Sequence, residues 1–239
     1  MTGTQHPTDP PRDPRAAAPH DARGLRLVHA LLALTAMSGL IDAVTYLGLG
    51  HVFTANMTGN VVVLGFAAAG APGFSVPHTA ASLACFLLGA TTGGRMTRRL
   101  TPRSRRGLAR TTLGAEALLL GAAAAVAALT PDDAPVTVYA IIALTAFAMG
   151  LRNATVRKLG VRGLTTTTVV TMTLTGLAAD SRAGDGTRPR SPRRTGSVVS
   201  MFAGAVLGAV LVLHHDLAVP LLLAAATSAV LAVTISGKD

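Results

Sequence analysis

Residues 53–60 read FTANMTGN, and this stretch decides how the chain folds. It places amides, hydroxyls and a glycine between two long apolar segments, in a chain that is 50% hydrophobic and only 13% charged. Several apolar runs approach the roughly 20 residues that a helix needs to cross a bilayer. Polar amides at membrane depth are costly and need a partner or a function. We therefore expect the stretch to break a helix inside an all-α integral membrane protein.

The chain divides into a tail and one membrane domain. Residues 1–24 are rich in proline and charge and lack an apolar run, which predicts a disordered cytoplasmic tail. Residues 25–235 form a single polytopic domain. Its eight apolar segments are residues 25–49, 52–70, 78–95, 111–130, 135–152, 165–179, 198–214 and 217–235.

The basic residues indicate how many segments cross the membrane. The 21 Lys and Arg residues cluster in the tail, at 95–110, at 152–162 and at 182–194, with Lys238 last. Eight crossings would put the clusters at 95–110 and 152–162 outside, against the preference of Lys and Arg for the cytoplasm. If 52–70 and 165–179 instead enter and leave by the same face, every Lys and Arg is inside. We predict about six transmembrane helices plus two re-entrant or broken segments, with both termini cytoplasmic, a basic cytoplasmic loop at 181–197, and a bacterial cytoplasmic membrane as the location.

The net charge of +10 does not indicate nucleic acid, because the basic residues lie between hydrophobic segments. Beside the bilayer itself, anionic lipid at the cytoplasmic loops is the expected partner. The single Cys85 excludes an intrachain disulfide. No nucleophile–base set, phosphate loop or metal-ligand spacing is present, so we expect neither an enzyme nor a cofactor.

The two halves of the domain resemble each other. The matched pairs are ALTA at 33–36 and 143–146, Gly39-x-x-Asp42-Ala43 and Gly150-x-x-Asn153-Ala154, and Gly89-Ala90-x-x-Gly93 and Gly204-Ala205-x-x-Gly208. Their common order predicts a repeat of about residues 25–130 in about residues 135–235. With six spans the two copies have opposite orientations, an inverted 3+3 repeat of the kind found in transporters.

Three further stretches carry a resemblance to a known family: GLIDAVTYLGLGHVFTANMTGN, AMGLRNATVRKLG and LTTTTVVTMTLTGLAAD. Over roughly residues 27–235 the chain resembles the YoaK-like family of bacterial integral membrane proteins. The resemblance implies about six spans and no established activity. Family members often carry Gln where this chain has Arg152, so the role of a neutral amide is not expected at that position here.

Asp42 has two interpretations. A membrane carboxylate usually faces the protein interior and binds a cation, a proton or a substrate. Alternatively, Asp42 caps the broken segment by accepting from backbone N–H groups near Asn56. Both remain open.

The remaining candidates for a solute path or a helix break are Asn56, Thr58, Gly59, Asn60, Asn153 and Thr167. Such polar groups either line a path or satisfy the backbone where a helix breaks, as the hydrocarbon requires. Gly89, Gly93, Gly204 and Gly208 are predicted to let helices approach closely, within one chain or in a homo-oligomer. Glu116, within two turns of Arg110 near the inner face, is expected to pair locally or to snorkel to the interface, with a coupling role as the alternative.

Two functions fit this pattern. The first is a transporter or channel for a small solute or ion, with its path at the polar helix breaks. The second is a non-transporting membrane scaffold or sensor that binds a partner or lipid.

Overall fold

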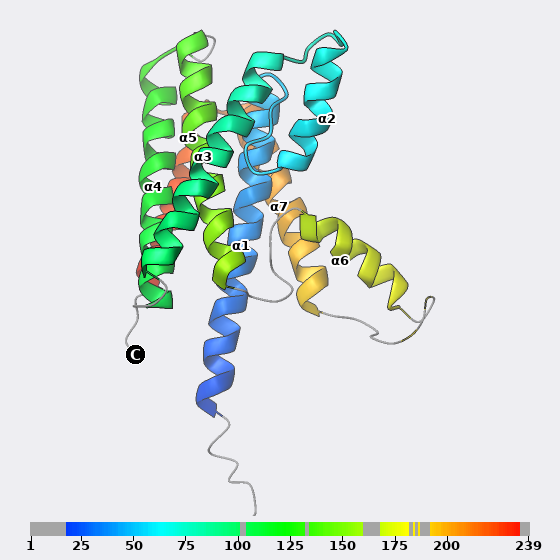
Figure 1. Cartoon of the computed structure of the whole chain (residues 1–239), viewed down its shortest axis with the longest axis vertical. Coiled ribbons are helices and arrows are strands. Elements are labelled where there is room, and N and C mark those ends of the chain that lie inside the picture. Colours follow the sequence, from blue (N-terminus) through cyan, green and yellow to red (C-terminus); the bar gives the residue numbers. More distant parts are fainter. Residues whose placement is uncertain are drawn as a thin grey trace, which may run out of the picture.

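The computed structural model describes residues 18–100, 104–131, 134–159, 168–181, 184, 186 and 192–234. These residues form helices and no strand (Figure 1). The helices are α1 (Ala18–Gly48), α2 (Met57–Ala68), α3 (Val76–Leu100), α4 (Arg105–Leu129), α5 (Pro135–Leu159), α6 (Thr168–Ala179), α7 (Pro192–His214) and α8 (Ala218–Thr234). Each of the eight apolar segments overlaps one of these helices, so the prediction of an all-α architecture is confirmed.

Two boundaries differ from the sequence expectation. α1 begins at Ala18, so residues 18–24 belong to a helix and not to the tail. α7 begins at Pro192, which shortens the expected loop 181–197. In both places the helix continues past its apolar stretch into polar residues, where hydropathy gives no signal of a boundary.

Four helical stretches of the described chain are long and apolar enough to cross a membrane: Val28–Gly48, Arg105–Leu129, Pro135–Leu159 and Arg194–His214. α8 is as apolar but has 17 residues. Large apolar side chains cover the outside of the bundle, among them Leu118, which is 78% exposed, and Phe202, which is 69% exposed. A surface of this kind suits lipid and not water.

The long helices run side by side, and α2 and α6 lie at opposite ends of the bundle (Figure 1). α1 packs along α7, α3 along α5, and α4 along α8. The core between them contains Ile41, Ile141, Ile142, Met149 and Leu221, all fully buried.

Glycines set the contacts of the two closest helix pairs. A Cβ at Gly204 of α7 would collide with the backbone carbonyl of Ala36 in α1, and Gly208 meets Leu40 in the same way. In the other pair, a Cβ at Gly89 of α3 would collide with the carbonyl of Phe147 in α5, and Gly93 meets Leu151. Only a residue without a side chain permits this approach of two backbones.

The α1 and α5 sides of these contacts also contain a glycine each. A Cβ on Gly39 would meet the backbone of Met201 and Ala205 in α7. A Cβ on Gly150 would meet the backbone of Phe86 and Ala90 in α3. The α1–α7 contact thus repeats the α3–α5 contact in detail.

The chain turns back on itself at α2. Figure 1 shows the segment after α1 descending toward the middle of the bundle, from which α2 returns to the end where α3 begins. The FTANMTGN stretch supplies the turning point, because α2 starts at Met57 with Asn56 as its N-cap.

Candidate functional site

Asp42 holds the turning point to α1. Its Oδ1 accepts hydrogen bonds from the backbone N–H groups of Thr54 (3.1 Å), Ala55 (2.8 Å) and Asn56 (3.2 Å). Those groups precede α2 and have no helical carbonyl to bind, so a buried acceptor must satisfy them. Of the two interpretations of Asp42, these hydrogen bonds agree with the second, in which Oδ1 caps the broken segment.

Asn60 ties the same stretch to α3. Its Oδ1 accepts from the Phe53 N–H at 2.9 Å, and its Nδ2 donates to the Phe53 carbonyl at 2.6 Å. The Ser82 hydroxyl of α3 donates to that carbonyl at 2.7 Å and accepts from Asn60 Nδ2 at 3.1 Å. Asn60 and Ser82 are fully buried. The polar groups of this network are therefore occupied within the protein.

Asn56 and Gly59 make their contacts within the FTANMTGN stretch itself. Asn56 Oδ1 accepts from the Gly59 N–H at 3.1 Å and caps α2. A Cβ at Gly59 would lie 2.8 Å from the ring of Phe53. Thr58 is exposed on the surface of α2. These contacts give the stretch a structural role.

A buried ion pair lies deeper in the bundle. Arg152 of α5 donates to Glu116 of α4 at 2.9 Å and to the Ser38 hydroxyl of α1 at 2.6 Å. The Arg152 side chain is 2% exposed and that of Glu116 is 0% exposed. The expectation that Glu116 pairs locally with Arg110 or snorkels to the interface is wrong, because its carboxylate is buried and binds Arg152, 36 positions away.

Some buried acceptor atoms of the bundle have no hydrogen-bond partner within the described residues. They include Asp42 Oδ2, Glu116 Oε2 and Asn153 Oδ1. Ser228 of α8 lies beside Glu116, and its hydroxyl contacts the Met37 sulfur at 3.8 Å. Ser38 and Asp42 are one turn apart on α1, so Arg152 lies near both carboxylates.

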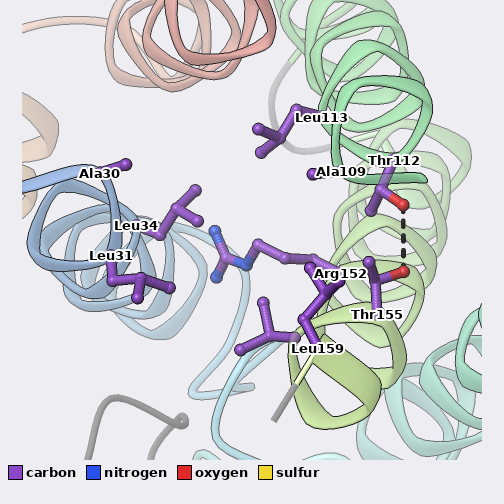
Figure 2. Close-up of a pocket in the computed structure, with 10 residues that line it drawn as sticks. Ala30, Leu31, Leu34, Ala109, Thr112, Leu113, Arg152, Thr155 and Leu159 are labelled. Atoms are coloured by element: carbon purple, nitrogen blue, oxygen red, sulfur yellow. Dashed lines mark hydrogen bonds between the residues drawn. The ribbon is translucent and has the colours of Figure 1, made fainter. Parts of the chain in front are cut away.

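A cavity of about 60 Å³ adjoins the ion pair between α1, α4 and α5. Figure 2 shows Arg152 extending from α5 toward Leu31 and Leu34 of α1. Thr112 and Thr155 face each other on α4 and α5, with their hydroxyls 3.0 Å apart. The cavity is thus apolar on most sides, and Arg152 is the one charged residue among the described residues that line it. The Arg152 guanidinium is occupied by Glu116 and Ser38, so the cavity presents mainly apolar surface.

The sequence candidates form two groups in space. Asp42, Asn56 and Asn60 meet at the turn before α2, whereas Asn153 lies next to Arg152 on α5. Thr167 lies outside the described residues. Sequence reasoning missed the link from Ser38 to Arg152 and Glu116. One signal was available, namely two charges of opposite sign in separate apolar helices, each needing a partner.

Comparison with known proteins agrees with the membrane architecture. A 36% identical relative is the UPF0700 transmembrane protein YoaK of Bacillus subtilis (strain 168), matched over 151 residues. The match covers 63% of this chain and spans 64% of the relative's length. No solved structure matches significantly.

A protein-family model, described as Protein of unknown function (DUF1275), matches residues 30–234. That range includes the FTANMTGN turn, both close helix pairs and the buried ion pair. The resemblance read from the sequence motifs is confirmed. The chain therefore belongs to this family of YoaK-like transmembrane proteins, whose function is unknown.

Proposed function

We propose that this protein transports a small solute or ion across the bacterial cytoplasmic membrane, and that it is built as an inverted repeat. The observation that carries the proposal is the equivalence of the two glycine contacts. Gly204 meets Ala36, three residues before Gly39, and Gly89 meets Phe147, three residues before Gly150. The alignment that matches Gly39 with Gly150 therefore also matches these two contact residues. A shared sequence pattern and a shared packing geometry at the same residues support a common repeat.

The helix order supports opposite orientations of the two halves. α1 to α4 correspond to α5 to α8, and the contact of α1 with α7 then corresponds to that of α5 with α3. α2 and α6 have 12 residues each and lie at opposite ends of the bundle. Paired short helices in inverted halves are typical of transporters, whose binding sites lie between the repeats.

In the proposed topology six helices cross the membrane, namely α1, α3, α4, α5, α7 and α8. The exposed basic residues Arg98, Arg99, Arg105, Arg157 and Lys158 then lie on the cytoplasmic side. Anionic lipid headgroups are their proposed partners, at about 1 kcal/mol for each basic residue near the surface.

The proposed path differs from the one that the sequence indicates. Asn60 and Asp42 Oδ1 are occupied by backbone groups at the turn before α2, so these atoms are not available to a solute. The path proposed instead runs past the buried Arg152–Glu116 pair and the cavity beside it. The pair joins α4 of the first half to α5 of the second, which is where a site between repeats is expected.

Transport is tested with purified protein in liposomes, using acetate, chloride, K⁺ and protons as probes. We expect flux of at least one probe, and at least a tenfold lower flux in the double variant Glu116→Gln/Arg152→Gln, which removes both charges. Thr91→Ala on the exposed side of α3 is the matched control and should transport like the wild type. Equal flux in a folded double variant would contradict the proposed path.

A second candidate is a non-transporting scaffold or sensor that binds lipid or a partner. The observation in its favour is that Asp42 and Asn60 bind backbone groups of the FTANMTGN turn within the protein, so these hydrogen bonds need no solute. This candidate predicts no flux of any probe, together with a higher melting temperature in vesicles of anionic lipid than in neutral ones. In neither case does the proposal include a catalytic step.

A further inference from the structure

We propose that Asp42 is a proton-binding site, and that a proton on its Oδ2 weakens the cap that holds the turn before α2. The proposal names the coupling ion of the transport function and rests on that function for its physiological role. The binding of the proton itself does not depend on transport.

The buried charges do not balance when all are ionised. Among the described residues, the bundle interior holds two carboxylates, Asp42 and Glu116, and one cation, Arg152. Arg152 contacts Glu116 directly at 2.9 Å, so these two neutralise each other. Asp42 is then left with an uncompensated negative charge while 5% exposed. An unpaired charge at this depth is expensive, and a bound proton removes it.

The two oxygens of Asp42 have different tasks. Oδ1 accepts three backbone hydrogen bonds, while Oδ2 has no partner within the described residues. A proton therefore adds to Oδ2 without displacing a donor. No covalent bond other than the new O–H forms, and the proton comes from the bulk solvent and returns to it.

Within the described part of the chain, the helices packed against α1 offer Asp42 no other counter-charge. Arg152 of α5 is the charged group that faces it, and α5 otherwise carries Tyr139 and, near its end, Arg157 and Lys158. α7 is titratable only at its ends, at Arg193, Arg194 and His214, and neither α2 nor α8 contains a titratable residue. On α1 itself, Tyr46 is one turn away, and its phenol is not a cation.

Protonation affects the turn because the same carboxylate binds the proton and accepts the three backbone hydrogen bonds. Hydrogen bonds to an ionised acceptor are about twice as strong as those to a neutral one. Neutral Asp42 consequently holds Thr54, Ala55 and Asn56 less firmly, and α2 becomes freer to move from its position against α3. Proton binding is thereby linked to the motion of a helix at the end of the bundle.

The test is pH-difference infrared spectroscopy on the full-length protein in lipid, with and without aspartate carrying a ¹³C side-chain carboxyl. We expect a protonated-carboxyl band that grows on acidification, shifts with the label, vanishes in Asp42→Asn and persists in Glu116→Gln. The amide introduced by Asp42→Asn keeps a carbonyl oxygen for the three N–H groups, so the variant is designed to fold. A pH-dependent band absent from Glu116→Gln but present in Asp42→Asn would overturn the proposal, as would the lack of any labelled band lost in Asp42→Asn.

Hydrogen exchange of the wild type supplies a second measurement, which holds even if Asp42→Asn does not fold. After correction for intrinsic rates, we expect the Thr54, Ala55 and Asn56 amides to lose at least tenfold protection at acidic pH. The amides in the middle of α4 should not change and serve as the internal control. Constant protection at the three amides would overturn the link to the turn. If the liposomes show no flux of any probe but the infrared band of protonated Asp42 is present, transport of these probes is refuted while the proton-binding site is supported.

Discussion

Asp42 and Ala55 join the first helix to the chain reversal that follows it, through a 2.8 Å hydrogen bond from the Ala55 N–H to Asp42 Oδ1. The contact is buried and is flanked by two more from the same carboxylate oxygen. One acidic side chain thus satisfies three consecutive backbone donors that no helix serves. Together with Asn60 and Ser82, which bind Phe53, this acceptor satisfies backbone groups that the reversal leaves without helical partners.

Removing the acceptor should destabilise the protein. Asp42→Ala leaves the N–H groups of Thr54, Ala55 and Asn56 buried without a partner, and a buried unsatisfied group costs about 1–3 kcal/mol. We expect the variant to lose about 3 kcal/mol or more and to melt at a distinctly lower temperature in detergent. Asp42→Asn keeps an acceptor oxygen and is the matched control, which should melt much closer to the wild type. Equal melting of Asp42→Ala and the wild type would contradict the cap.

The glycine contacts give a second prediction. Gly204→Ala places a Cβ against the Ala36 carbonyl, and Gly89→Ala places one against the Phe147 carbonyl. Because both obstacles are backbone atoms, neither helix can yield by rotating a side chain. We expect each variant to lose about 1–3 kcal/mol of stability, as overpacked cores do.

The control for these variants is Gly114→Ala on α4. A Cβ at Gly114 would meet nothing within 4 Å, so this change should leave the melting temperature the same or raise it slightly. Similar losses at Gly204 and Gly89 would support equivalent packing of the two helix pairs. If Gly114→Ala lost as much stability as Gly204→Ala, the effect of the glycine changes would not come from close contact between helix backbones.

Hydropathy and the placement of charge predict the helices of this chain but not their partners. The segment 52–70 is apolar enough to suggest a crossing, and the polar FTANMTGN stretch and the basic clusters at 95–110 and 152–162 argue for a re-entrant turn. The capping role of Asp42 can be proposed from the sequence, because a carboxylate before a broken helix can accept from the free backbone N–H groups there. Ser38 and Ser82 gave no such signal, since one serine in an apolar helix looks like any other. Their partners, Arg152 and Asn60, lie 114 and 22 residues away, and only tertiary packing selects them.

The buried ion pair gives a third prediction. Glu116→Gln keeps an acceptor oxygen for Arg152 but removes the negative charge that neutralises it, and Arg152→Gln leaves the Glu116 carboxylate without its cation. Breaking one side of a buried pair typically costs about 3–5 kcal/mol. Removing both charges should cost less than the sum of the single changes. Melting temperatures of the four proteins in a double-mutant cycle measure the coupling, and simple additivity would mean that the pair is not energetically linked.

The proposed topology gives the last prediction, which labelling of single cysteines can decide. In a Cys85→Ala background, Pro72→Cys, Arg105→Cys and Pro131→Cys place one thiol each before α3, before α4 and after α4. All three native residues are exposed, so the changes should not disturb packing. With six spans and a cytoplasmic N-terminus, a membrane-impermeant maleimide added outside intact cells should label positions 72 and 131 and spare 105. Eight crossings from the same start predict the reverse at every position, because the segment 52–70 would then end inside. Labelling at 105 alone would therefore refute the re-entrant turn and, with it, the opposite orientation of the two halves.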